Sequence, residues 1–143
     1  MISDSHKNIK KLTLDNHVLI WYSEGTNLSN DQVNIIEQAQ EQGNLYISTI
    51  SIWEVAMLIE KDRIALSISL DEWIEKLTFT LRLNFIDLSI AILTQSCALP
   101  KYDYKDPADR LIISSVRSIN SHLMTFDQRI IDYADKGYLK VIR

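Results

Sequence analysis

The stretch Lys105–Ile113, KDPADRLII, combines a strong helix-start signal with two closely spaced acids. Asp106 suits the N-cap position, Pro107 the first helical position and Asp109 the third, and an apolar run follows at once. Both carboxylates would then lie at the positive end of the helix dipole, and capping alone accounts for them. A function for this stretch therefore depends on whether other carboxylates meet it in space.

On either side of this helix, short apolar runs alternate with segments of helical periodicity over the 143 residues. This alternation is typical of parallel βα units. We therefore predict an α/β fold, a three-layer α/β/α sandwich around a mostly parallel five-stranded sheet. We expect one domain over residues 11–143, preceded by a flexible N-terminal arm of residues 1–10. The predicted strands cover residues 11–14, 45–48, 84–88, 122–125 and 138–142.

Two S-x-x-E motifs predict where helices begin in the first half of the chain. Ser51 and Glu54 have capping-box spacing and predict a helix that opens at this motif and ends at about Lys61. Ser69 and Glu72 repeat the spacing and predict the start of the next helix. By this interpretation, Glu54 is a capping residue.

Composition excludes several classes of protein. A net charge of −4 argues against a surface that binds nucleic acid over its whole area, but it permits an enzyme that holds a phosphodiester through metal ions. The three glycines are too few and too far apart for a GxGxxG fingerprint or a P-loop. The single cysteine, Cys97, which we expect to be buried, cannot form an internal disulfide, and this fits a cytoplasmic protein. We find no membrane span or signal core.

Acids recur at the ends of the predicted strands and at the helix starts that follow. Asp15 follows the first strand, Glu54 opens the helix after the second, Asp106 and Asp109 open a late helix, and Asp127 follows the fourth strand. In a parallel sheet these places share one edge, where ligands bind. Each acid alone is better explained as a cap, but a group of them would be repulsive without a cation. Oxygen ligands without His or Cys suit Mg²⁺ or Mn²⁺.

Four motifs, in order, resemble those of PIN-domain proteins, most closely the VapC-type toxins of bacterial type II toxin–antitoxin systems. They are LDNHVLIW, ISTISIWEVAMLIEKDRIAL, DPADRLIISS and LMTFD, and they extend from Leu12 to about Tyr133. The resemblance implies a PIN-like fold and an endoribonuclease that depends on Mg²⁺ or Mn²⁺. It also implies a homodimer, an RNA substrate and a cognate antitoxin protein that inhibits the enzyme.

The same resemblance assigns the catalytic and metal-binding residues by position. Asp106 is the additional acid of members with the DPxDR sequence, and we interpret it as a cap or an outer group. Asn16 departs from the pattern, because Thr is frequent after the first acid. No carboxylate is missing, so the resemblance implies an active enzyme. The four matching acids are Asp15, Glu54, Asp109 and Asp127.

Several neighbouring residues have both structural and functional interpretations. We expect His17 to pack away from Asp15, while Thr125 points to the same side of its strand as Asp127 and is suited either to orienting a ligand or to strand formation. Arg110 and Lys105 are candidates for contacts with RNA phosphates or with the acids. The three tryptophans are predicted to be core or interface residues: Trp21, Trp53 and Trp73.

Other functions remain open at this point. A phosphatase with Asp15 as the aspartyl nucleophile would place a second acid two residues later, where the chain has His17. A receiver-like signalling module would be phosphorylated at Asp87, but it would need an acidic pair after the first strand, and Asp15 is followed by Asn16. A PIN fold used only for binding is a third alternative, although the four acids favour catalysis.

Overall fold

Five parallel strands form the centre of the structure, a computed structural model that describes residues 9–143. The strand order is β3-β2-β1-β4-β5, and each neighbouring pair of these strands is parallel. The predicted α/β sandwich is thereby confirmed, and the predicted N-terminal arm falls mostly outside the described residues. The strands are β1 (Leu12–Leu14), β2 (Leu45–Ser48), β3 (Asn84–Ile86), β4 (His122–Met124) and β5 (Lys140–Ile142).

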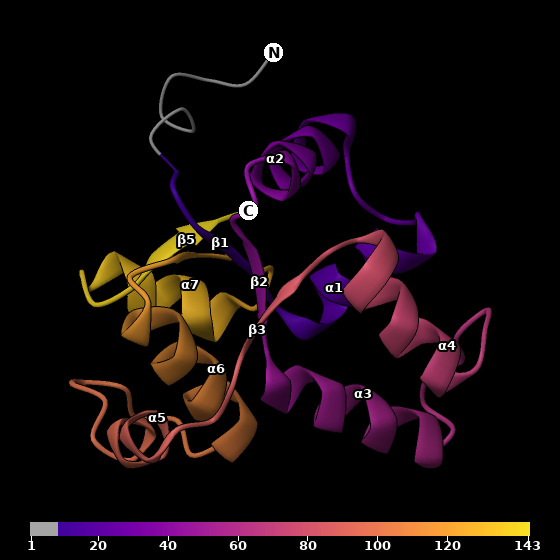
Figure 1. The fold of residues 1–143 in the computed structure, drawn as a ribbon. Helices are drawn as coiled ribbons and strands as arrows, with labels where there is room; N and C mark the ends of the chain where they lie inside the picture. Colours follow the sequence, from indigo (N-terminus) through magenta and orange to yellow (C-terminus); the bar gives the residue numbers. More distant parts are fainter. Residues whose placement is uncertain (1–8) are drawn as a thin grey trace.

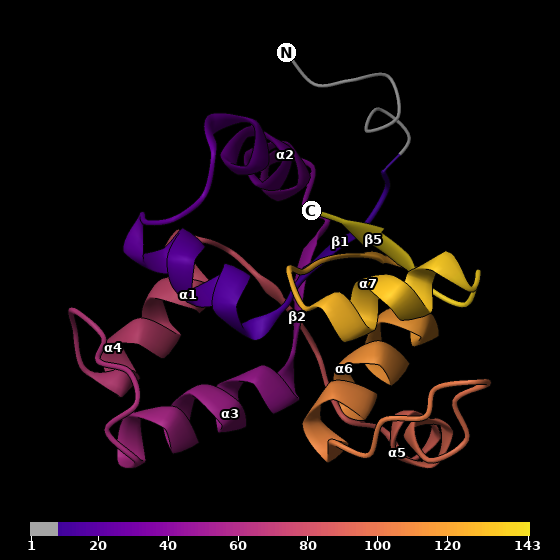
Figure 2. The same cartoon turned by 180° about the vertical axis from the view of Figure 1, so that it is seen from behind.

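Helices cover both faces of the sheet (Figures 1 and 2). One hydrophobic cluster joins β1 and β2 to α1, α2 and α4, and a second joins β4 to α6 and α7, with α5 packed on α6. The helices are α1 (Asn16–Glu24), α2 (Asn30–Glu41), α3 (Thr49–Glu60), α4 (Leu70–Glu75) with the π-helical turn η2 (Lys76–Thr80), α5 (Ile90–Ser96), α6 (Pro107–Ser118) and α7 (Gln128–Asp135).

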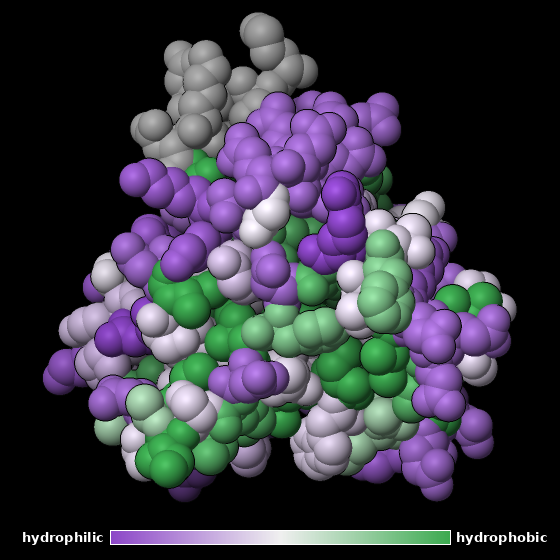
Figure 3. Space-filling model, in the orientation of Figure 1, coloured by the Kyte–Doolittle hydropathy of each residue, from purple (hydrophilic) through white to green (hydrophobic). Residues whose placement is uncertain are grey.

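The surface is divided between a hydrophilic end and a more apolar end. In Figure 3 hydrophilic residues cover α2, and hydrophobic residues gather in the lower half, where Figure 1 shows α3 and α5. Ile90 and Leu93 of α5 are exposed to 82% and 44%, Trp53 of α3 to 54% and Phe79 of η2 to 77%. No helix within residues 9–143 has the length and apolar character needed to cross a bilayer.

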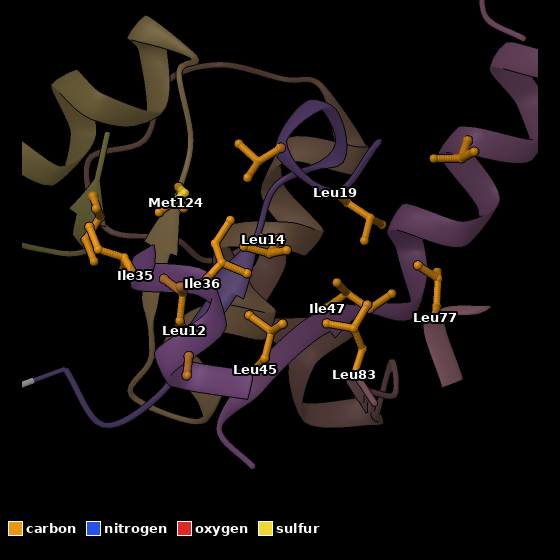
Figure 4. Close-up of a cluster of buried hydrophobic side chains, with 14 of the residues drawn as sticks. Leu12, Leu14, Leu19, Ile35, Ile36, Leu45, Ile47, Leu77, Leu83 and Met124 are labelled. Atoms are coloured by element: carbon orange, nitrogen blue, oxygen red, sulfur yellow. The ribbon is translucent and has the colours of Figure 1, made fainter. Parts of the chain in front are cut away.

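The central strand β1 alternates its side chains between the two cores. Leu12 and Leu14 are fully buried and pack with Leu45 of β2 in the first cluster (Figure 4). Thr13 points to the other face, where its hydroxyl hydrogen-bonds to the hydroxyl of Ser121 at 2.8 Å. Because successive side chains alternate, Asp15, two residues after Thr13, emerges on this second face.

Buried serines attach α6 to the sheet. The hydroxyls of Ser115 and Ser48 lie 2.9 Å apart, which joins the middle of α6 to the end of β2. Ser114 donates to the carbonyl of Ile92 in α5 at 2.7 Å. Since the hydroxyls of Ser48, Ser114 and Ser115 each have a partner, these contacts fix the position of α6 without leaving those groups unsatisfied. The start of α6, with its two acids, is thereby held beside the start of α3 (Figure 1).

The structure confirms some predicted helix starts and corrects one. Asp106 caps α6 by accepting a hydrogen bond from the Ala108 amide, and Ser69 forms a capping box with Glu72. The predicted capping box of Ser51 with Glu54 is wrong, because β2 runs directly into α3 and Ser48 is the N-cap. Glu54 consequently lies beyond the first turn of α3, where its carboxylate is available for other contacts.

Arg110 holds the loop between α5 and α6. Its guanidinium donates to three main-chain carbonyls, those of Ser96 (2.8 Å), Tyr102 (3.0 Å) and Tyr104 (2.6 Å). Nε and Nη1 of Arg110 therefore hold the loop, and the hypothesis that Arg110 also contacts RNA or the acids stays a prediction. The DPADR stretch thus does two things: it starts α6, and it fixes the chain that precedes it.

We expect Arg110→Met to lower the free energy of unfolding by about 2–4 kcal/mol. The substitution removes hydrogen bonds from a charged donor, each worth about 1.5–3 kcal/mol. The loop carbonyls that lose this donor must then hydrogen-bond to water. Urea denaturation measures the change. The matched control is Arg82→Met, at an exposed position before β3 at the far end of the sheet, which should stay within about 0.5 kcal/mol of the parent. Equal effects of the two substitutions would contradict this role.

Candidate active site

A cavity of about 600 Å³ opens at the carboxyl end of β1 and β4. The sheet reverses its strand order between these two strands, which is where ligands bind in open α/β sheets. All four acids predicted for the site lie around this one cavity, together with Asp106. The lining residues are Asp15, Asn16, His17, Val18, Trp21, Glu54, Leu58, Asp106, Asp109, Phe126, Asp127 and Arg129.

Asp15 and Asp127 are joined through Thr125. The Thr125 hydroxyl, fully buried, donates to Asp15 Oδ2 at 2.6 Å and accepts from the Asp127 amide at 3.1 Å. Asp15 Oδ1 accepts from the Asn16 amide at 2.7 Å, so Asp15 also caps α1. Burial raises the pKa of Asp15, and the two hydrogen bonds oppose that effect. The Thr125 hydroxyl thus positions two acids of the site, and its predicted role in orienting a ligand stays a prediction.

Asn16 connects Asp15 to Glu54. Only 8% of Asn16 is exposed, and its side-chain Nδ2 donates a short hydrogen bond to Glu54 Oε1. Burial raises the pKa of Glu54, opposed by this hydrogen bond and assisted by the charges of Asp106 and Asp15. The other amide atom, Asn16 Oδ1, is buried and has no partner in the described part of the chain. An unpaired buried acceptor is costly, so a donor from water or from a hydrated ligand is expected beside it.

Asp109 is an acid with a strongly raised pKa. Burial, and then the charges of Asp106, Asp127 and Asp15, raise its pKa to about 7. The residue lies in the first turn of α6, where the helix dipole favours a negative charge. Burial and the neighbouring carboxylates together outweigh that contribution. Asp109 therefore takes up a proton more readily than an ordinary carboxyl group unless a cation is present.

This group of acids fits a hard divalent cation. The donors are oxygens, the charges repel one another, and the buried Asn16 oxygen needs a donor. Within residues 9–143, however, no three Asp, Glu, His or Cys side chains converge closely enough to form a ready coordination sphere. Mg²⁺ is commonly bound through one or two carboxylates while it keeps several waters, so this open arrangement suits an ion held partly through water.

Some residues near the acids differ from their predicted roles. His17 is exposed and lines the cavity, with its ring 5.9 Å from that of Trp21, so the prediction that it packs away from the site is wrong. Trp73 is buried and donates to Ser23, as expected for a core residue. Cys97 is exposed, contrary to the expectation that it is buried, because α5 ends there.

Two residues that line the cavity were not found from the sequence: Asn16, which seemed only a departure from a motif, and Arg129. Tyr102, also not singled out, is affected by the charge of Asp109 but is not among the lining residues. The ring of Tyr102 is buried, its hydroxyl has no partner among the described residues, and burial and then the charge of Asp109 raise its pKa. A tyrosine-bearing loop directly before an acid-rich helix start was the one signal for Tyr102.

The comparisons with known proteins agree with this arrangement. The PIN domain model matches residues 12–136, which span β1 to α7 and all five acids of the cavity. The chain belongs to the PIN-domain family. It is also 37% identical over 118 residues to Ribonuclease VapC22 of Mycobacterium tuberculosis, a match that covers 82% of this chain and 87% of that protein.

Solved structures share the fold at lower identity. The complex VapBC2 from Rickettsia felis, bound to a promoter DNA fragment, contains a chain with a TM-score of 0.66 and 20% identity. FitAcB from Neisseria gonorrhoeae contains one with a TM-score of 0.56 and 18% identity. Each match covers 92% of this chain and 96% of the other. At these identities the likeness establishes the fold.

The pKa of Asp109 predicts that the metal-free protein loses stability as pH rises. The unfolded chain releases this proton near 3.8, whereas the native state keeps it up to about 7, so deprotonation in this range favours unfolding. We expect thermal unfolding in EDTA to occur a few degrees lower at about pH 8 than at about pH 5. Asp109→Asn should flatten this profile and raise the melting temperature at the higher pH.

Mg²⁺ or Mn²⁺ should raise the melting temperature of the parent at about pH 8, because binding favours the native state. The increase should be smaller in Asp109→Asn. Asp132→Asn, an exposed position on α7, is the matched control and should behave like the parent. A profile for Asp109→Asn as steep as that of the parent would contradict the assignment of the raised pKa.

Proposed function

We propose that this protein is a metal-dependent endoribonuclease, the toxin of a type II toxin–antitoxin pair. The observation that carries the proposal is the convergence of Asp15, Glu54, Asp109 and Asp127 on one cavity at the switch point of the sheet. Membership of the PIN-domain family and the likeness to a protein named as a ribonuclease support it. The reaction is hydrolysis: water adds to phosphorus, one bridging P–O bond breaks, and the leaving oxygen takes a proton.

We assign the metal-binding role to the same four acids, some directly and some through water, with Mg²⁺ or Mn²⁺ as the ion. When bound, such a cation polarises the phosphoryl group and makes water a stronger nucleophile at neutral pH. The surrounding residues orient the acids. Thr125 and the Asn16 amide each donate to one oxygen of Asp15, and the Asn16 side chain donates to one oxygen of Glu54. The lone pairs that these contacts leave free are available to the ion and its waters.

His17 and the position of Asp87 favour this function over the two alternatives of other classes. An aspartyl phosphatase would have a second acid two residues after its nucleophile, but the residue two positions after Asp15 is His17, which lines the cavity. Asp87 follows β3, an edge strand, and it is not among the lining residues of the cavity. A binding protein without catalytic activity would not need a group of carboxylates whose repulsion destabilises the fold.

We also propose two protein partners, a second copy of the chain and a cognate antitoxin. The exposed apolar side chains of α5, α3 and η2 are of the kind that such contacts bury. Two of the structural relatives are found in VapBC2 and FitAcB, which supports association with a second protein. We expect the protein to act in the cytoplasm, where its RNA substrate is found.

Purified protein should cleave single-stranded RNA with Mg²⁺ or Mn²⁺ and not with EDTA. The substitutions Asp15→Asn, Glu54→Gln, Asp109→Asn and Asp127→Asn should each lower kcat/KM by about 100-fold or more, the scale of losing one electrostatic group in a transition state. Asn keeps the N-cap at Asp15 and Asp127, so the helix starts survive. Cleavage of a labelled RNA on denaturing gels measures the effect.

Two matched variants test whether the loss belongs to the cavity. Asp132→Asn removes an exposed carboxylate from α7 and should retain full activity. Asp106→Asn keeps the cap of α6 and should reduce activity by less than about tenfold, because we assign this residue an outer role. Cleavage that is insensitive to EDTA and to all four acid substitutions would overturn the proposed function.

A further inference from the structure

We propose that Arg129 binds a phosphate of the RNA backbone beside the bond that is cleaved, and that Tyr104 holds its guanidinium in place for this contact. This inference rests on the proposed function and names a substrate-binding residue for it. Arg129 lies in the first turn of α7, two residues after Asp127, and its exposed side chain lines the cavity. Among the described residues that line this cavity, it is the one arginine or lysine.

The position of the guanidinium is defined by an aromatic ring. The Cζ atom of Arg129 lies over the ring of Tyr104, 4.7 Å from the centroid. The ring in turn is placed by the loop before α6, since the carbonyl of Tyr104 accepts from Arg110 and its ring meets that of Tyr102 at 5.5 Å. The face of an aromatic ring attracts the cation without consuming its N–H donors in conventional hydrogen bonds. Arg129 is therefore positioned while its donors stay available.

The charge of the cavity explains why such a residue is needed. Five carboxylates line it, so an incoming phosphodiester meets repulsion wherever a cation does not offset them. A metal ion acts only at the phosphate it contacts, whereas a strand of RNA carries a charge at every nucleotide. A guanidinium is the side chain best suited to a phosphate, because its planar donors contact two oxygens together and it is always charged. Arg129 supplies that group at the edge of the acidic site.

Binding of a labelled single-stranded RNA, measured by fluorescence anisotropy with Ca²⁺ replacing Mg²⁺ to slow cleavage, tests this role. The variants are Arg129→Gln, Arg129→Lys, Tyr104→Leu and Tyr104→Phe. Arg82→Gln is the matched control, the same change of charge at an exposed position before β3, at the opposite end of the sheet. Each titration is repeated at several salt concentrations from about 50 to about 200 mM.

We expect Arg129→Gln to weaken binding about tenfold, the scale of one charge-assisted contact. The slope of log K against log salt should fall by about 0.7, the value for one phosphate contact on a single strand. Arg129→Lys should keep the slope and lose part of the affinity, because it retains the charge without the planar donors. Tyr104→Leu should weaken binding to a lesser degree, Tyr104→Phe should resemble the parent, and Arg82→Gln should change neither quantity.

An unchanged salt slope in Arg129→Gln overturns the inference, and it leaves Arg129 with the structural role of packing on Tyr104. A slope that falls equally in Arg82→Gln also overturns it, because the effect would then be one of net charge. Intact RNA binding with loss of association with the antitoxin would assign Arg129 to that protein instead. If RNA does not bind in the presence of Ca²⁺, the salt dependence of kcat/KM with Mg²⁺ is measured instead, and Arg129→Gln is again compared with Arg82→Gln.

The two proposals fail in different ways. If the parent protein does not cleave RNA with Mg²⁺ or Mn²⁺, the proposed function fails and the inference fails with it. If the parent cleaves RNA and the four acid substitutions abolish cleavage, but Arg129→Gln behaves like Arg82→Gln, the inference alone fails. Normal thermal unfolding of each Arg129 and Tyr104 variant confirms that a loss of binding is not a loss of fold.

Discussion

The carboxylates at the ends of β1 and β4 repel one another, and the arrangement of the surrounding helices and loops depends on how this repulsion is offset. The sheet brings Asp15 and Asp127 together because the strands that precede them are neighbours, and α3 and α6 add Glu54 and Asp109. Burial and proximity together raise the pKa of Asp109 to about 7. Carboxylates placed this close together destabilise the folded protein. Their presence at one site therefore indicates a function that requires them.

Each acid is partly stabilised by the local structure that delivers it. Asp15, Asp106 and Asp127 are N-caps of α1, α6 and α7, so three helix starts, with their positive dipole ends, surround one cavity. Capping and site formation were competing interpretations of these residues in the sequence, and in the structure they are the same feature. Because a cap uses one oxygen of a carboxylate, the other oxygen stays available to a neighbour such as Thr125 or to an ion.

The parts of the structure that the sequence predicted are those that depend on local chemistry. Strand order along the chain, the caps at Ser69 and Asp106, and the acids near the strand ends follow from turn residues and periodicity. The capping box at Ser51 failed because β2 continues into α3 without a loop, which only strand pairing determines. The contact of Asn16 with Glu54 joins residues 38 positions apart, and no local pattern specifies such a pair.

Arg110 and Arg129 show why residue type alone did not assign the cations. Both are arginines close in sequence to an acid of the site, and the sequence offered the first as the RNA contact. In the structure Nε and Nη1 of Arg110 donate to three loop carbonyls, whereas Arg129 lies over a ring that leaves its donors available. The two are linked, since the loop that Arg110 fixes carries the ring of Tyr104 that holds Arg129. The DPADR stretch therefore organises both the acidic side of the cavity and the guanidinium of Arg129 at its edge.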